Sequence, residues 1–315
     1  MIQKMEFLLS EFMKRGQQML RLAIYYQVLH RNDGNPLYVW AALKRREKAG
    51  LLKVDHLNPT GDSAQFGKYD FHIDVDWGED GLGGLLPYVP SETPKPSIVW
   101  NSDTHLGYDY RLKKSLKADY VFCAQKKAVE DMKRDGVPNP IWLPHAVEPL
   151  AYPRYELASK KYDVCFVGHV NSQNRIDALD RVFKEVPNFF YGQRLFEDAA
   201  RKYAESKIVF NIAMKDDVNM RCFEAMASGS MLLTDRISSI EELFVDGKHC
   251  VMYDSLDDMA EKAKYYIEHD EERERIASAG YEEVMAKHTI DHRIDKIFET
   301  IGVAKLEAKQ EAVCN

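Results

Sequence analysis

Short apolar runs alternate with amphipathic helical patterns along almost the whole chain of 315 residues. In the first half, strand-like runs span residues 21–29, 71–77, 97–103, 116–125 and 141–147. In the second half, they span residues 162–170, 188–192, 207–213, 230–235 and 250–254. Strands that alternate with helices favour parallel sheets that are covered by helices on both faces. We therefore predict an α/β fold made of two Rossmann-like domains that face a cleft.

A stretch with two prolines, residues 149–160, separates the two series of elements. A chain of this length suits two domains of roughly 150 residues each. We predict an N-terminal domain over residues 1–155 and a C-terminal domain over residues 156–289, followed by an amphipathic helix and a tail over residues 290–315. Residues 1–20 carry charges throughout, and we expect them to form an additional amphipathic helix rather than a signal peptide.

The side-chain composition argues for a globular protein without a large basic face. Hydrophobic residues make up 45% of the chain and charged residues 30%, with a formal net charge of −7. This balance excludes a disordered chain and disfavours nonspecific nucleic-acid binding as the main function. No apolar stretch approaches the roughly 20 residues of a membrane-spanning helix, so no membrane span is expected. The five cysteines are odd in number and form no CxxC pair, which indicates a reducing compartment and a cytoplasmic location.

Residues 214–235, MKDDVNMRCFEAMASGSMLLTD, carry the most specific pattern. A helix is expected to begin near Met220, and the free N–H groups and dipole at such a terminus form an anion site. Arg221 in the first turn adds a forked cation suited to phosphate, and Glu224 one turn later can accept both hydroxyls of a ribose. Asp216 lies in the loop before the helix, where it can meet a sugar hydroxyl. These groups together are what a nucleotide-sugar site needs.

The same segment resembles the C-terminal domain of the glycosyltransferase group 1 families, and most closely that of the spore-maturation CgeB-like branch. The usual family pattern is Glu, seven residues and a second Glu, followed by Ala-Met-Ala-x-Gly. Here seven residues separate Asp216 from Glu224, and residues 225–229 read Ala-Met-Ala-Ser-Gly. The resemblance implies the two-domain GT-B fold, in which a helix within residues 290–315 crosses back to the N-terminal domain. It also implies that Glu224 binds the ribose diol and that Asp216 faces the sugar.

The resemblance extends upstream to residues 162–175, YDVCFVGHVNSQNR, which look like the first strand and loop of that domain. There Gly168 would let the backbone pass close to the donor diphosphate, and Arg175 would neutralise it. In the first half of the chain, Asp103 and His105 follow a predicted strand and can orient or deprotonate an acceptor hydroxyl. A turn in which Asp103 caps backbone N–H groups is the structural alternative.

These residues predict a glycosyltransferase that moves a sugar from a nucleotide-diphosphate-sugar donor to an acceptor hydroxyl. No cofactor or metal is expected, because the acidic residues of 74–80 lack the spacing of a calcium loop and the resembling families rarely need a metal. The spacing of the two acids favours retention of the anomeric configuration. The acceptor stays open among a glycan, a protein, a small molecule and modified DNA. Two alternatives are a nucleotide-sugar-binding subunit without turnover and a sugar-nucleotide epimerase on the same fold.

Overall fold

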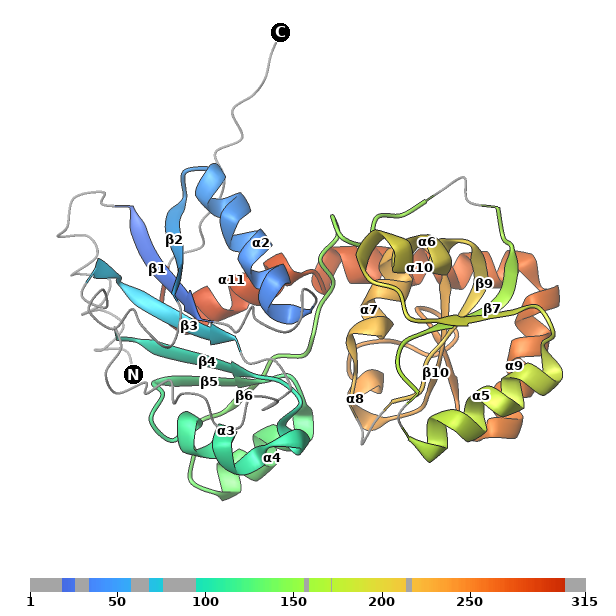
Figure 1. Ribbon diagram of the computed structural model, residues 1–315, viewed down its shortest axis with the longest axis horizontal. Coiled ribbons are helices and arrows are strands. Elements are labelled where there is room, and N and C mark those ends of the chain that lie inside the picture. The colour runs from blue at the N-terminus through green and yellow to red at the C-terminus, as the bar shows by residue number, and fades with distance from the viewer. Residues whose placement is uncertain are drawn as a thin grey trace, which may run out of the picture. The chain divides into compact units, whose positions relative to one another are not determined.

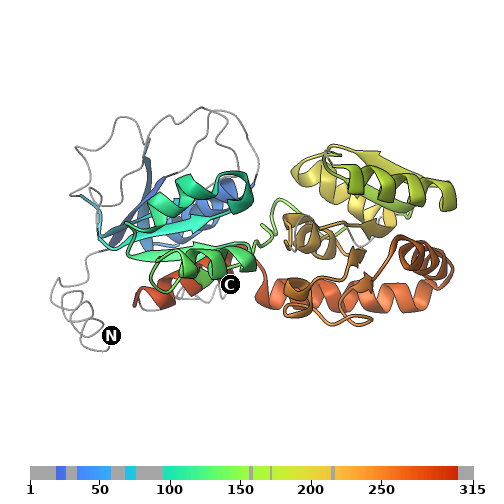
Figure 2. The ribbon, with the colours of Figure 1, turned by 90° about the horizontal axis from the view of Figure 1, so that it is seen from below.

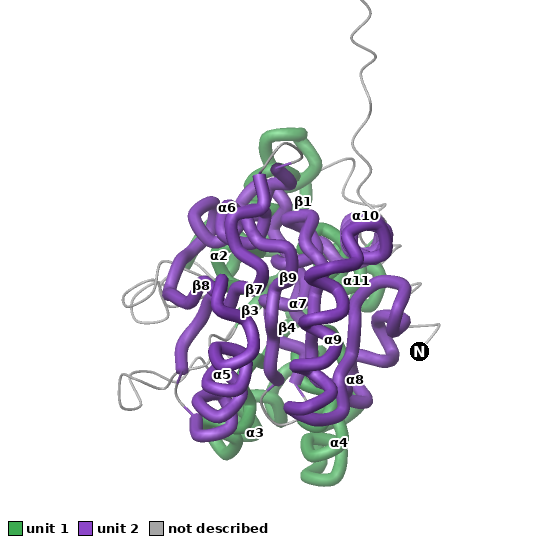
Figure 3. The backbone as a smooth tube through the Cα atoms, turned by 90° about the vertical axis from the view of Figure 1, so that its right-hand side faces the viewer, with its two compact units in different colours: residues 1–144, 290–315 green, residues 145–289 purple. Residues whose placement is uncertain are grey.

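The computed structural model describes residues 19–25, 34–57, 68–75, 95–155, 159–170, 172–213 and 217–303. The chain divides into two compact units, one made of residues 1–144 with 290–315 and the other of residues 145–289 (Figure 3). The predicted boundary after residue 155 lies downstream of this division, because the preceding segment packs on the second unit. In that segment, Tyr152 stacks on Tyr203 with 6.4 Å between ring centroids, and the Arg154 guanidinium lies over the Tyr281 ring. Most of the helix predicted for residues 1–20 lies outside the described residues.

The first unit is built on a sheet of six strands. The strands are β1 (Leu20–Tyr25), β2 (Leu52–Leu57), β3 (Phe71–Val75), β4 (Ser97–Asn101), β5 (Tyr120–Cys123) and β6 (Ile141–Trp142). The helices are α2 (Asn35–Lys48), the short helix η3 (Thr104–Leu106), α3 (Tyr108–Ser115), α4 (Lys126–Arg134) and α11 (Ile290–Thr300). β4 is buried at every position, as expected for a central strand that helices cover on both faces.

Helix α11 belongs to the first unit although it follows the second unit in sequence. It packs against α2 on one side of the sheet, whereas α3 and α4 pack against β4, β5 and β6 on the other side (Figure 1). The Arg46 guanidinium forms ion pairs with the carboxylates of Asp291 and Asp295. The rings of Phe71 and Phe298 meet edge to face with 5.7 Å between centroids.

Strand β2 is absent from the strands predicted from the sequence. It lies at the edge of the sheet and pairs only with β1 among the described strands. Lys53 and Asp55 on this strand are exposed, whereas Leu52 and Val54 are buried. An edge strand of this kind keeps polar side chains on one side, so it lacks the continuous apolar run that marks a central strand.

The second unit is built on a sheet of five strands. The strands are β7 (Tyr162–Val167), β8 (Phe189–Gly192), β9 (Ser206–Phe210), β10 (Met231–Asp235) and β11 (Val251–Tyr253). The helices are α5 (Gln173–Glu185), α6 (Phe196–Ala204), α7 (Met220–Ala227), α8 (Ser238–Glu241), α9 (Leu256–Glu268) and α10 (Asp270–Lys287). Helices α5 and α9 pack together on one face, and α6, α7 and α10 cover the other face, as Figure 2 shows from below.

Both sheets have the same doubly wound connection. Their strand orders are β2-β1-β3-β4-β5-β6 and β11-β10-β9-β7-β8, and all the pairings are parallel. The direction of winding reverses between β1 and β3 in the first unit and between β7 and β9 in the second. Ligands of such sheets bind beyond the carboxyl ends of the strands at this reversal, which we call the switch point. The predicted α/β class is confirmed. Within the described part of the chain, no helix is both long and apolar enough to cross a bilayer.

Candidate functional site

Arg221 joins the two strands that flank the switch point of the second unit. It is the second residue of α7 and is almost completely buried. Its Nε donates to the backbone oxygen of Val167 at the end of β7 (2.7 Å), and its Nη1 donates to Oδ1 of Asn211 just after β9 (2.7 Å). Its guanidinium also lies 4.1 Å from the ring centroid of Phe166. A cation is therefore fixed where doubly wound sheets bind their ligands.

Gly168 makes room for this guanidinium. It follows β7 directly and has a φ of 153°, in the region that favours glycine. A Cβ at this position would lie 2.1 Å from Nη2 of Arg221, which is far closer than atoms can approach. The sequence predicts that Gly168 lets the backbone pass close to the diphosphate. In the structure, the absence of a side chain at Gly168 makes room for the Arg221 guanidinium.

Arg175 brings a second cation to the same end of the sheet. It lies in the first turn of α5, is buried, and donates from Nη1 to the backbone oxygen of His169 (3.0 Å). Burial, and then the charge of Arg221, lower the pKa of the Arg175 guanidinium to about 10, and the Asp235 carboxylate partly offsets this. A buried cation that is repelled by its neighbour is stabilised by a bound anion.

Asp235, the last residue of β10, is an acidic residue whose charge acts on Arg175. Its Oδ1 accepts hydrogen bonds from the Ala213 N–H (2.8 Å) and the Thr234 hydroxyl (3.2 Å). Burial raises the pKa of the Asp235 carboxyl, although these hydrogen bonds oppose the rise. The two buried guanidinium groups therefore lie near a carboxylate that already accepts two hydrogen bonds.

Asn211 was not predicted as a site residue, although its side chain contacts Arg221 directly. Its side chain is fully buried, and its Oδ1 accepts from Arg221 and from Nδ2 of Asn219 (3.0 Å). Its Nδ2 donates to Oγ1 of Thr234 (3.0 Å), and its backbone oxygen accepts from the Tyr253 hydroxyl (2.9 Å). The available sequence signal was an asparagine directly after the apolar run KIVF, at the carboxyl end of a strand.

Helix α7 places Met220 and Glu224 as the sequence predicted. The helix begins at Met220 after Asn219, and Gly229 with a φ of 80° follows its end. The Glu224 side chain is buried near Tyr203 of α6, since its charge contributes to raising the pKa of the Tyr203 hydroxyl, after burial. A hydrogen bond between Tyr203 and Arg221 opposes this rise. Tyr203 thus lies near both Arg221 and Glu224, and no pattern in the sequence indicated this.

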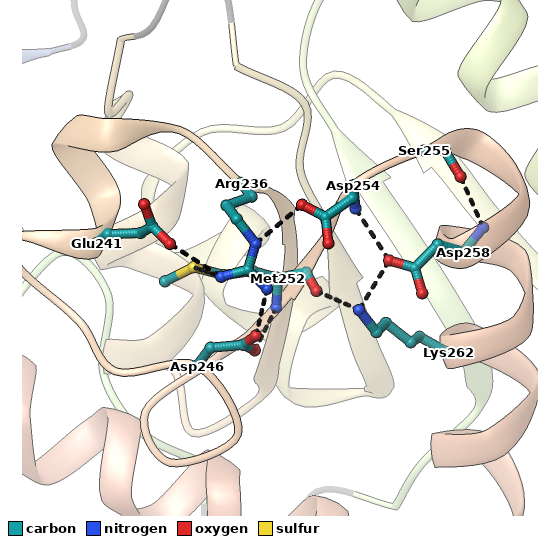
Figure 4. Close-up of polar contacts among 8 residues, drawn as sticks. All are labelled: Arg236, Glu241, Asp246, Met252, Asp254, Ser255, Asp258 and Lys262. Atoms are coloured by element: carbon teal, nitrogen blue, oxygen red, sulfur yellow. Dashed lines mark hydrogen bonds and ion pairs between the residues drawn. The ribbon is translucent and has the colours of Figure 1, made fainter.

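A third arginine nearby is engaged by carboxylates instead. Arg236 follows β10, and its guanidinium pairs with Glu241 (3.0 Å), Asp246 (2.6 Å) and Asp254 (2.9 Å) (Figure 4). Asp254 donates its N–H to Asp258, which also accepts from Lys262 (2.7 Å). These pairs hold the ends of β10 and β11 to α8 and α9. The charge of Arg236 is therefore matched locally by carboxylates.

The described part of the second unit does not contain the remaining predicted site residues. Asp216 lies outside the described residues. Asp103 and His105 belong to the first unit, after β4, where Asp103 has a left-handed backbone (φ 45°) and makes no capping hydrogen bond to η3. The capped-turn alternative for Asp103 is therefore wrong for its side chain. Asp74 of β3 forms an ion pair with Lys114 of α3 (2.9 Å).

The described residues offer little for a metal or a reactive thiol. No group of three His, Cys, Asp or Glu side chains among residues 19–303, gaps excepted, is arranged to hold a metal ion. Cys222 lies within the site, with its Sγ 3.4 Å from Nδ2 of Asn211. Burial raises the pKa of this thiol well above its ordinary value, which argues against a thiolate nucleophile.

The solved structures most useful for comparison are glycosyltransferases. HepE from Anabaena, solved with UDP and glucose, matches with a TM-score of 0.62 at 12% identity, covering 90% of this chain and 99% of HepE. Sucrose-phosphate synthase from Thermosynechococcus elongatus matches with 0.60 at 12% identity, over 90% of this chain and 100% of the synthase. The pneumococcal O-GlcNAc transferase GtfA, solved with UDP and GlcNAc, matches with 0.55 at 12% identity, over 76% and 58%. These likenesses establish the fold.

A family model described as glycosyl transferase-like matches residues 156–299. The matched range contains Gly168, Arg175, Arg221 and Glu224, and hence the cluster at the switch point. No curated protein matches the chain. Residues 156–299 thus match a glycosyl transferase-like family model, and the two-unit α/β fold of the chain matches structures of GT-B glycosyltransferases.

Proposed function

We propose that this chain is a glycosyltransferase that transfers a sugar from a UDP-sugar to an acceptor hydroxyl. The observation that carries this proposal is the pair of buried guanidinium groups, Arg175 and Arg221, at the switch point of the second unit. Two cations there suit a diphosphate, because each guanidinium can form charged hydrogen bonds with phosphate oxygens. The choice of UDP is supported by HepE and GtfA, whose structures contain it.

Each donor group has a partner in this proposal. Arg221 and Arg175 contact the diphosphate together with the backbone N–H groups at Met220, and Glu224 accepts hydrogen bonds from the ribose hydroxyls. During transfer, the bond between the anomeric carbon and the diphosphate oxygen breaks, and a bond from the acceptor oxygen to that carbon forms. Negative charge grows on the leaving diphosphate, and preorganised cations stabilise it without reorganisation. Since two guanidinium groups supply this charge, we propose that no metal is required.

The acceptor side and the stereochemistry are further parts of the proposal. Asp103 and His105 would orient the acceptor hydroxyl or accept its proton. The seven-residue spacing of Asp216 and Glu224 supports retention of the anomeric configuration and kinship with the CgeB-like branch. The free thiols of Cys123, Cys165 and Cys222 support a reducing, cytoplasmic location.

The proposal is tested by the slow release of nucleoside diphosphate from UDP-, GDP-, ADP- and dTDP-sugars, for the native chain and for Glu224→Ala. We expect release from the UDP-sugar, unchanged by EDTA and lost in the variant. Stabilisation by UDP without release from any donor would favour a binding subunit, and a changed sugar without an acceptor would favour an epimerase. Neither release nor stabilisation with any donor would overturn the nucleotide-sugar site itself.

A further inference from the structure

The side-chain amide of Asn211 uses all of its hydrogen-bonding capacity inside the switch-point cluster. Its oxygen accepts from Arg221 and Asn219, and its nitrogen donates to Thr234 and approaches the Cys222 sulfur. An amide offers two donor hydrogens and two acceptor lone pairs, so none is left over. The residue is also fully buried, which makes each lost hydrogen bond costly.

A chain of hydrogen bonds fixes which way this amide faces. The Thr234 hydroxyl donates to the Asp235 carboxylate (3.2 Å), so its oxygen is left to accept from Asn211. The Asn211 nitrogen must then face Thr234, and the Asn211 oxygen must face Arg221. Asp235 therefore determines, through Thr234 and Asn211, that an acceptor meets the Arg221 guanidinium. A flipped amide would instead point N–H groups at a cation.

We propose that Asn211 is a positioning residue that holds Arg221 and the start of α7 in the orientation that receives the donor diphosphate. Its neutral oxygen fixes Nη1 of Arg221 without cancelling the positive charge, so the charge stays available to an anion. The hydrogen bond from Asn219 ties the residue before α7 to the same atom. This inference rests on the proposed function, because it assigns a role within the same nucleotide-sugar site.

Asn211→Asp separates this role from a purely structural one. The carboxylate is nearly the same size and still accepts from Arg221 and Asn219, and the Thr234 hydroxyl can rotate and donate to it. However, it neutralises Arg221 and repels a diphosphate. We expect the affinity for UDP to fall about 10- to 100-fold, whereas the affinity for uridine, which lacks the diphosphate, changes less than about threefold. UDP is measured by titration calorimetry and uridine by saturation-transfer NMR.

Two further variants complete the experiment. Thr234→Val removes the acceptor that orients the amide, and we expect a smaller loss, of about three- to tenfold, again for UDP and not for uridine. If Asn211→Asp does not fold, Thr234→Val alone tests the proposal. Asn101→Asp is the matched control, because Asn101 is equally buried at the end of β4 but lies in the first unit. It should leave both affinities unchanged.

The outcomes separate the two proposals. If the native chain binds UDP and the variants lose UDP and uridine equally, or lose neither, Asn211 is not a positioning residue for the diphosphate. If the native chain binds none of the four nucleoside diphosphates, the proposed function fails and this inference fails with it. A selective loss of UDP affinity in both Asn211→Asp and Thr234→Val supports the inference.

Discussion

The two units share one topology but use buried charge in opposite ways. In the first unit, Asp74 of β3 and Lys114 of α3 form a buried ion pair in which each charge has its partner. In the second unit, Arg175 and Arg221 lie close enough to repel, and the nearby Asp235 offsets this only in part. An ion pair balances its own two charges, whereas two like charges that are held close together are stabilised when an anion binds to both. This contrast supports the proposed binding of an anion by the second unit.

The ends of β4 and β9 show the same contrast with one residue type. Asn101 and Asn211 are both fully buried asparagines at the carboxyl end of a strand. Oδ1 of Asn211 accepts two hydrogen bonds, whereas Oδ1 of Asn101 accepts none from the residues that the structure describes. β9 flanks a switch point and β4 does not. The more complete network therefore lies where the topology places ligands.

The largest effect on stability is expected from breaking the ion pair between Asp74 and Lys114 in the first unit. Lys114→Met leaves the Asp74 carboxylate buried without its cation, which should lower the free energy of unfolding by about 3 to 5 kcal/mol. Chemical denaturation measures this loss, and Asp74→Asn in the same background should recover part of it. The affinity for UDP should not change. A variant that is as stable as the native chain would show that this pair does not support the fold.

Removing Arg175 should change the stability little and the affinity for UDP strongly. Arg175→Met removes a charge that its neighbour repels, so the free energy of unfolding should fall by less than about 1 kcal/mol. The affinity for UDP should fall about 10- to 100-fold, because a charged hydrogen-bond partner of the diphosphate is lost. Calorimetric titration and denaturation of the same preparation give both quantities. A large loss of stability with unchanged affinity for UDP would mean that Arg175 supports the fold and does not bind the diphosphate.

A methyl group at Gly168 should weaken the site by displacing Arg221. The added Cβ of Gly168→Ala would meet Nη2 at 2.1 Å, so the guanidinium must move. We expect about a tenfold loss of UDP affinity. Gly247→Ala is the control, because Gly247 also has a positive φ (70°) but a Cβ there meets nothing within 4 Å. Equal losses in the two variants would mean that backbone strain, and not the cation, is responsible.

The smallest effect is expected from alkaline pH. Because the pKa of Arg175 in the free protein is lowered to about 10, this side chain loses its charge at a lower pH than an ordinary arginine. Its contribution to UDP affinity is therefore present below pH 10 and is lost as the pH rises through 10. The affinity is measured between pH 8 and 10.5 for the native chain and for Arg175→Met. Loss of affinity through ionisation of the base affects both proteins, so only the difference between them reports on Arg175.

Most of the sheet framework could be predicted from the sequence. Central strands such as β4 and β9 are apolar runs, and the start of α7 follows from the polar residues before Met220. β2 escaped prediction because an edge strand needs only one apolar side. α6 lacks a side-chain cap at its start, so no capping residue marks where the helix begins.

The contacts of the individual site residues were harder to predict from the sequence. Arg221 and Glu224 stand in a recognisable local pattern, since α7 alone determines their spacing. Asn211, Thr234 and Tyr203 carry no such pattern, because their roles depend on partners on other strands and helices. Residues of this kind are found only when the packing of the sheet is known.

Local patterns in the sequence specify the alternation of strands and helices, and with it a parallel α/β fold and the position of the helix that begins at Met220. These properties follow from local periodicity and from the termini of single elements. The three-dimensional fold, in contrast, was needed to learn that residues 145–155 pack on the second unit. It also decided that Val167, Asn211 and Arg221 meet at one switch point. Burial and pairing of charge arise between distant segments, so no local pattern in the chain can encode them separately.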